Sequence, residues 1–254
     1  MLKHLPNAMT CGNLLCGCLG IYVTLQPTNV VGPTVLYEQL SIASLFILLA
    51  AVLDFGDGFV ARLVNASSAI GKELDSLADM VTFGVLPAFI VHRLLVEADL
   101  VHRYGVAPEV AGASASGLLS NYVLLLPLLL AIFSALRLAK FNVDTRQSDR
   151  FIGVPTPANA MVVASLPLIL YTQPQLAAVI LNPYVLSGYV LVMSYLLVAE
   201  LPLMAFKFKS FAWQENRVKY SFLIASVLLI GLLQFAAIPL IILLYILLSL
   251  LVKE

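Results

Sequence analysis

Long apolar runs, separated by short links that carry polar residues, proline and glycine, repeat along the whole chain. Each run approaches the roughly 20 residues that an α-helix needs to cross a bilayer. None shows the strict alternation of a half-buried strand, so the pattern predicts membrane-spanning helices. We expect spans at about residues 9–25, 38–62, 72–96, 118–140, 157–171 and 183–206.

The last apolar stretch, residues 221–252, is too long for one ordinary crossing. The segment from Gln234 to Pro239 predicts a break, which gives about eight spans in all. One tilted or kinked helix in this stretch would give seven.

Composition fits this pattern, because 61% of the residues are hydrophobic, 11% are charged and the mean hydropathy is +0.99. We therefore expect an all-α polytopic membrane protein whose residues 1–254 form a single integral membrane domain. Lys and Arg number 14, as do Asp and Glu. With no basic excess, the sequence predicts no nucleic-acid partner.

The distribution of basic residues predicts the orientation. If eight spans start from a cytoplasmic N-terminus, only Arg93 and Arg103 fall on the outer side. The positive-inside rule favours this arrangement. The inner group consists of Lys3, Arg62, Lys72, Arg137, Lys140, Arg146, Arg150, Lys207, Lys209, Arg217, Lys219 and Lys253.

Four aspartates stand out within the apolar sequence. Asp54 and Asp57 are three residues apart, and Asp75 and Asp79 are four apart, so each pair projects from one face of a helix. The short link at residues 63–70 predicts antiparallel neighbouring helices whose carboxylates converge. Such a group is costly at a membrane edge unless a cation lies within it. Hard divalent ions suit carboxylates, and a pair of them commonly binds phosphates.

Small residues follow the first aspartates on the same helix. Gly58 and Ala61 leave room for a ligand to approach the backbone, and Arg62 can bind a phosphate. This stretch reads D-x-x-D-G-x-x-A-R-x8-G-x3-D-x3-D and resembles the signature of the CDP-alcohol phosphotransferases. Its fixed positions are Asp54, Asp57, Gly58, Ala61, Arg62, Gly71, Asp75 and Asp79.

The resemblance implies a helical bundle with a catalytic motif at residues 54–79, and it implies a homodimer. It also implies that the four aspartates hold two divalent metal ions, Mg²⁺ or Mn²⁺, and that Asp79 is the general base. The CDP-linked lipid would bind along Gly58, Ala61, Arg62, Ser68 and Gly71.

A second group of polar residues lies at 137–157, where the chain reads RLAKFN and then FIGVPTPANA. These segments resemble the phosphatidylserine synthase branch of the family, although Lys140 stands where many relatives carry Arg. A serine acceptor needs a cation for its carboxylate and a polar partner for its amine. Arg137, Lys140 and Asn142 can supply them. Arg146 and Arg150 fit ordinary topogenic charge equally well.

The resemblance therefore implies transfer of the phosphatidyl group of CDP-diacylglycerol to the hydroxyl of L-serine, giving phosphatidylserine and CMP. It places the enzyme among membrane lipids, and we expect a prokaryotic inner membrane with the active site facing the cytoplasm. Three alternatives stay open: another acceptor such as glycerol 3-phosphate or inositol phosphate, an archaeal-type lipid donor, and a cation transporter with intramembrane carboxylates.

Overall fold

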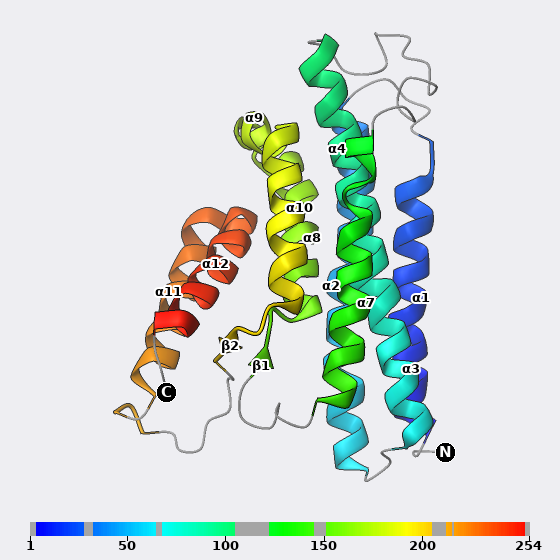
Figure 1. Cartoon of the computed structure of the whole chain (residues 1–254), viewed down its shortest axis with the longest axis vertical. Coiled ribbons are helices and arrows are strands. Elements are labelled where there is room, and N and C mark those ends of the chain that lie inside the picture. The colour runs from blue at the N-terminus through cyan, green and yellow to red at the C-terminus, as the bar shows by residue number, and fades with distance from the viewer. Residues whose placement is uncertain are drawn as a thin grey trace.

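Helices dominate the computed structural model of the chain, which confirms the expected all-α polytopic class. The structure describes residues 4–27, 33–64, 68–104, 122–144, 151–204, 212–214 and 216–251. Figure 1 shows long upright helices in one group, a second layer formed by α8 and α10, and a C-terminal pair at the side.

The first half of the bundle is built from long rods. They comprise α1 (Leu5–Leu25), α2 (Pro33–Leu63), α3 (Ala69–Asp79), the π-helical turn η2 (Met80–Val85), α4 (Leu86–Tyr104), the 3₁₀ turn η3 (Tyr122–Leu125) and α7 (Leu128–Val143). Together α3, η2 and α4 form one helical run.

The second half is shorter and more broken. It comprises β1 (Phe151–Ile152), α8 (Thr156–Thr172), η4 (Pro174–Leu176), α9 (Ala177–Ile180), α10 (Pro183–Val198), β2 (Pro202–Leu203), α11 (Arg217–Leu233), η5 (Gln234–Ala236) and α12 (Ala237–Leu251). The two strands pair antiparallel, with Phe151 opposite Leu203 and Ile152 opposite Pro202.

Local sequence explains several helix ends. Ser68 caps α3, because its hydroxyl accepts the Gly71 N–H at 3.0 Å. Asn182 caps α10 by accepting the Tyr184 N–H at 2.9 Å. Between β1 and α8, Gly153 has φ of +74°, and a Cβ there would lie 2.7 Å from the Leu197 carbonyl oxygen. Glycine therefore allows the strand to turn closely against the end of α10.

Five helical stretches in the described chain are long and apolar enough to cross a membrane, or six if the bent pair from α8 to α9 is one span. The 16-residue α10 is shorter, and 217–251 counts as a single stretch although it is interrupted at η5. Gln234, with φ of 52°, marks this interruption, which confirms the predicted break. Each expected span has a helical counterpart, and the total of eight stays a prediction.

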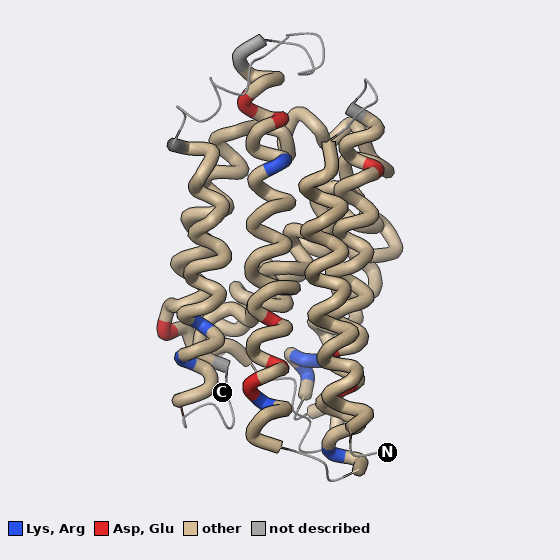
Figure 2. The backbone as a smooth tube through the Cα atoms, turned by 90° about the vertical axis from the view of Figure 1, so that its right-hand side faces the viewer, with Lys and Arg blue, Asp and Glu red and all other residues tan. Residues whose placement is uncertain are grey.

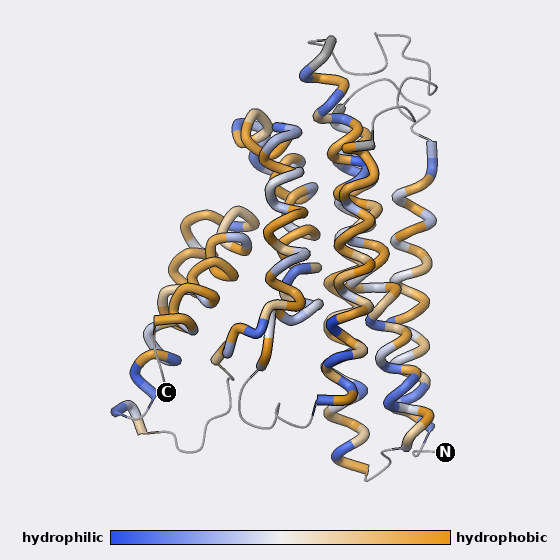
Figure 3. Tube along the Cα trace, in the orientation of Figure 1, coloured by the Kyte–Doolittle hydropathy of each residue, from blue (hydrophilic) through white to orange (hydrophobic). Residues whose placement is uncertain are grey.

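Polar residues gather toward both ends of the rods, whereas their middle is mostly apolar (Figure 3). In Figure 2 most of the described Lys and Arg residues lie toward one of these ends. Lys3, Arg146, Arg150, Lys207, Lys209 and Lys253 lie outside the described residues. The described part of the inner group thus shares one end of the bundle, as the predicted orientation requires.

The first helix packs against both α2 and α3. Leu40, Ile47, Phe83 and Leu86 are fully buried in the core that surrounds these contacts. Because α1 contacts both partners, α2 and α3 face each other across a cavity that all three helices line. The expected antiparallel pair therefore has a third helix as its common support.

Gly17 is required for the close approach of α1 to η2. A Cβ at this position would lie 2.5 Å from Thr82 Oγ1 and 3.1 Å from Thr82 Cα, whereas a Cβ at Gly188 of α10 would meet nothing within 4 Å. We expect Gly17→Ala to destabilise the protein by about 1–3 kcal/mol. The matched change Gly188→Ala should be neutral or slightly stabilising. Thermal unfolding of both variants in detergent measures this difference, and equal melting temperatures would refute the proposed crowding.

Candidate active site

Four carboxylates lie close together near the end of the bundle where most of the described Lys and Arg residues lie, as their spacing predicted. Asp54 and Asp57 lie near the end of α2, and Asp75 and Asp79 lie on α3. One carboxylate oxygen from each of Asp54, Asp57 and Asp75 lies within 4.8 Å of the others. Asp79 joins them because its carboxyl group contacts that of Asp54. The two helices therefore present one acidic cluster.

This cluster fits a divalent cation. Asp57 is only 6% exposed, and Oδ1 of Asp75 is buried without a hydrogen-bond partner in the described structure. Unpaired carboxylates in such surroundings repel one another and lose hydration. Oxygen ligands at this separation suit a hard divalent ion, which would both neutralise and coordinate them.

Helix α1 supplies two polar side chains that hold the cluster in place. The Thr10 hydroxyl lies 2.6 Å from Oδ2 of Asp57 and 3.0 Å from the Pro6 carbonyl, and its single proton can serve either oxygen. The charged carboxylate is the stronger acceptor. Asn13 donates from Nδ2 to Oδ1 of Asp79 at 3.1 Å. Asn13 is not among the site residues expected from the sequence, although an amide inside an apolar span is a signal of such a role.

The chain changes its helical geometry directly after Asp79. The next six residues form η2, a π-helical turn, and π-turns in helices occur frequently at functional sites. Within this turn, the Thr82 hydroxyl donates to the Asn13 carbonyl at 3.1 Å. Two hydrogen bonds therefore join Asn13 to the segment around Asp79.

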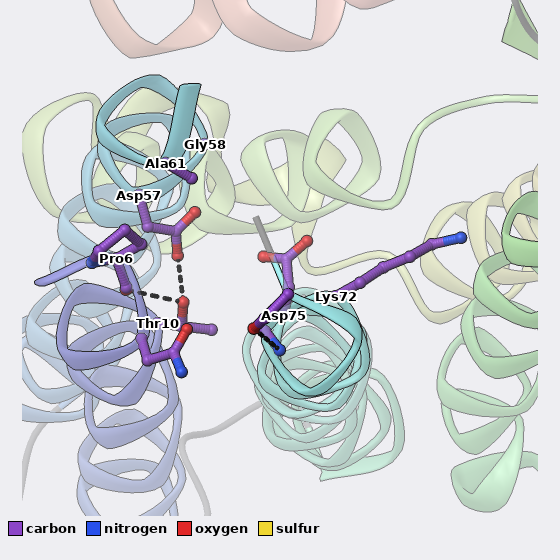
Figure 4. A pocket seen from close by; sticks show the side chains of 10 residues that line it. Pro6, Thr10, Asp57, Gly58, Ala61, Lys72 and Asp75 are labelled. Atoms are coloured by element: carbon purple, nitrogen blue, oxygen red, sulfur yellow. Dashed lines mark hydrogen bonds between the residues drawn. The ribbon is translucent and has the colours of Figure 1, made fainter. Parts of the chain in front are cut away.

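A cavity of about 220 Å³ opens between α1, α2 and α3 beside the cluster. Figure 4 shows Asp57 and Asp75 facing it from opposite sides, while Lys72 extends away from it. The Lys72 ammonium instead donates to the Asn142 carbonyl on α7 at 3.4 Å. The wall includes four of the residues assigned to the CDP-linked lipid, namely Gly58, Ala61, Ser68 and Gly71.

Two of these wall residues, Gly58 and Ala61, carry little or no side chain. A Cβ at Gly58 would meet nothing within 4 Å, so its surroundings are open. Ala61 lies on the same wall. Arg62, by contrast, is not part of this wall: its side chain is exposed and its Nε–H donates to the Gly58 carbonyl at 2.9 Å. The structure therefore places the guanidinium outside the cavity.

A second cavity, of about 290 Å³, lies on the α7 side of the bundle and includes Arg137 and Lys140 in its wall. The Lys140 ammonium is exposed and lies 3.5 Å from the Val198 carbonyl. Asn142 is not part of this wall, and its side-chain amide donates to the Ser76 hydroxyl at 2.8 Å. Two of the three expected acceptor residues are thus together, while the third joins α7 to α3.

Arg137 connects the second cavity to the acidic cluster. Its side chain is 7% exposed, and its Nε–H has no partner among the described residues. The guanidinium carbon lies 5.4 Å from the centre of the Phe141 ring, a favourable cation–π distance. The positive charge is within electrostatic range of Asp79. A molecule in this cavity would therefore meet a buried cation close to the last carboxylate.

Comparison with known proteins identifies this arrangement. The model of the CDP-alcohol phosphatidyltransferase family matches residues 3–203. The chain belongs to the CDP-alcohol phosphatidyltransferase family. The match includes both cavities and the acidic cluster, and it ends before α11 and α12.

Several relatives of this CDP-alcohol phosphatidyltransferase are named CDP-diacylglycerol–serine O-phosphatidyltransferase. The Bacillus subtilis protein is 31% identical over 206 residues, which cover 81% of this chain and 93% of the relative. A Helicobacter pylori protein is 33% identical over 160 residues, or 62% of this chain and 54% of the relative. The Saccharomyces cerevisiae protein is 35% identical over 133 residues, or 49% and 40%.

Replacement of Thr10 tests the support that α1 gives to this family's acidic cluster. We expect Thr10→Val to weaken divalent-metal affinity about 10- to 100-fold, because Asp57 loses its hydroxyl donor. Thr24→Val is a matched control in the same helix, since the Thr24 hydroxyl is buried and, among the described residues, bonds the Gly20 carbonyl alone, at 2.8 Å. Calorimetric titration with Mn²⁺ measures the affinity of each variant for the metal. An unchanged affinity for Thr10→Val would exclude this supporting role.

Proposed function

We propose that this protein transfers the phosphatidyl group of CDP-diacylglycerol to the hydroxyl of L-serine and releases CMP. One observation carries the proposal. The buried Arg137 lines a polar cavity and lies within electrostatic range of Asp79, in the acidic cluster of a CDP-alcohol phosphatidyltransferase. The names of the relatives support the same donor and acceptor. In this reaction the serine oxygen bonds to the lipid-side phosphorus as the bond from that phosphorus to the bridging oxygen breaks.

Asp54, Asp57, Asp75 and Asp79 are the proposed ligands of two divalent ions, Mg²⁺ or Mn²⁺. When bound, such ions supply positive charge that attracts the pyrophosphate and stabilises negative charge on the reacting phosphoryl group and on CMP. The protein's part is to hold the four carboxylates together. Thr10 and Asn13 do so from α1 by bonding Asp57 and Asp79.

The cavity between α1, α2 and α3 is the proposed site of the nucleotide part of the donor, with the acyl chains in the membrane. Gly58 and Ala61 leave space for the ligand, and Ser68 and Gly71 form the opposite wall at the start of α3. Backbone N–H groups at a helix start favour an anion. Arg62 follows Ala61 of this wall, and we propose that rotation away from the Gly58 carbonyl directs its guanidinium to a phosphate.

Asp79 is the proposed general base. It lies within electrostatic range of Arg137, and Asn13 donates to one of its carboxylate oxygens. The second oxygen is then oriented for the proton of the serine hydroxyl, which moves to Asp79 as the serine oxygen attacks phosphorus. The electron pair of the broken bond leaves with CMP.

Arg137 and Lys140 are the proposed partners of the serine carboxylate. Arg137 suits this role because its buried Nε–H has no partner in the described structure, and a carboxylate would satisfy it. For Asn142 the hydrogen bond to Ser76 supports a different role from the expected contact with the amine. It fixes α7 against α3, next to Asp75.

We further propose that residues 1–254 form one membrane domain in a prokaryotic inner membrane. Basic residues concentrated at the end of the bundle that carries the acidic cluster support an active site facing the cytoplasm (Figure 2). The family resemblance supports a homodimer. The yeast relative also makes a eukaryotic membrane compatible with this fold.

Release of CMP tests the reaction and the acceptor together. Purified protein in detergent, supplied with CDP-diacylglycerol and Mg²⁺ or Mn²⁺, should release CMP only when L-serine is added, and phosphatidylserine should form in equal amount. Glycerol 3-phosphate and inositol phosphate serve as competing acceptors. Release with one of these and not with serine would overturn the acceptor. The absence of metal-dependent release with every acceptor would favour the cation-transporter alternative.

Replacement of the proposed base tests its role separately from metal binding. We expect Asp79→Asn to lower kcat by at least about 10²-fold, because an amide cannot accept the serine proton. Thermal unfolding should stay close to that of the parent protein, since Asn keeps the shape of the side chain. Calorimetric titration with Mn²⁺ checks whether metal binding persists. A variant that stays active at saturating metal would remove Asp79 from the role of base.

A further inference from the structure

The wall of the cavity beside Arg137 carries both signs of charge. Arg137 and Lys140 supply the positive charges from α7, Asp144 follows that helix directly, and Glu200 follows α10. A cavity built for a phosphate-bearing alcohol would be expected to carry cations alone, because carboxylates repel a phosphate. Equal numbers of both signs fit a small molecule that is itself a zwitterion.

We propose that Asp144 and Glu200 recognise the ammonium group of the acceptor, so that this cavity selects a free α-amino acid. The proposal rests on the proposed function, whose acceptor site it completes: Arg137 and Lys140 account for the carboxylate of serine and leave its ammonium without a partner. Charge-assisted hydrogen bonds to carboxylates are the usual recognition of an ammonium group.

The different burial of the charged side chains in this cavity predicts how the acceptor is oriented. Arg137 is buried and lies within electrostatic range of Asp79. Lys140 and Glu200 are exposed, and Asp144 is partly buried. An amino acid bound here would have Arg137 on the side toward Asp79 and the two carboxylates toward the opening. Its hydroxyl would lie on the side of Arg137, where the proposed base is located. A cavity of about 290 Å³ has room for one such molecule.

Backbone hydrogen bonds fix the segment that carries Glu200 on both sides along the chain. On the N-terminal side the Leu196 carbonyl accepts the Val154 N–H at 3.0 Å, and on the C-terminal side the Leu201 carbonyl accepts the Gly153 N–H at 3.0 Å. The pairing of β1 with β2 continues this attachment. Glu200 therefore belongs to a fixed wall of the cavity.

Helix α12 forms hydrogen bonds with Met204, which directly follows β2 in the same segment. The Tyr245 hydroxyl donates to the Met204 carbonyl at 2.9 Å, and the Met204 N–H donates to the Ser249 hydroxyl at 3.2 Å. Tyr245 also lies within electrostatic range of Arg137. Helix α12 follows residues 3–203, the part of the chain that the family model matches.

Kinetics with two acceptors tests the recognition of the ammonium group. CMP release by the purified protein is measured with L-serine as the acceptor. It is measured again with 3-hydroxypropionate, which is serine without its amino group. If 3-hydroxypropionate is not a substrate, it is tested as a competitive inhibitor of serine. We expect Glu200→Gln and Asp144→Asn each to raise the KM for serine about tenfold, with kcat within about twofold. The KM or inhibition constant for 3-hydroxypropionate should stay unchanged or fall.

Controls separate this inference from a loss of structure. Glu38→Gln removes an exposed carboxylate near the start of α2, and it should leave both acceptors unaffected. Glu200→Asp and Asp144→Glu keep the charge, and their KM for serine should lie between those of the parent and the neutral variants. These two also replace any neutral variant that fails to fold.

The outcomes distinguish the inference from the function on which it rests. If the parent protein does not use serine, the proposed function fails. If the parent uses serine while the neutral variants keep its KM and its preference over 3-hydroxypropionate, the function stands and the inference is overturned. A fall in kcat with an unchanged KM would also overturn it, because the carboxylates would then act on another step.

Discussion

The convergence of four carboxylates at the edge of a membrane is the constraint on which the rest of this structure depends. Such a cluster is costly without a cation, and it must also be kept from spreading apart. Helix α1 provides that restraint: Thr10 bonds Asp57 on one side and Asn13 bonds Asp79 on the other. The close contact of Gly17 with Thr82 keeps α1 against η2. Packing that looks purely structural therefore sets the geometry of the acidic site.

The cluster lines one cavity and lies within electrostatic range of Arg137 in the wall of the second, and the two walls differ in chemistry. The cavity between α1, α2 and α3 has small residues and a helix start, which suit a nucleotide phosphate. The cavity beside α7 has charges of both signs. Arg137, in the wall of the second cavity, lies within electrostatic range of Asp79. A donor and an acceptor held in these places would meet at one carboxylate, which is the positioning that a transfer reaction requires.

The C-terminal helices follow residues 3–203, the part of the chain that the family model matches. They form an apolar pair at the side of the bundle (Figure 1), and α12 bonds the chain at Met204 through Tyr245 and Ser249. This contact stabilises a wall of the second cavity from a distance. A region without any catalytic motif can therefore influence the shape of that cavity.

The sequence by itself determined the helical class, the position of most helices, the break near Gln234 and the two carboxylate pairs. These features depend on the period and spacing of residues along one helix, which the order of the residues fixes directly. Only the tertiary structure decided that α1 supports the cluster through Asn13, that Arg62 turns back to its own helix and that Asn142 bonds Ser76. The tertiary structure also placed Asp144 and Glu200 in the wall of one cavity. These contacts depend on how each helix is rotated and which faces meet, and the fit of many apolar side chains from distant segments settles that.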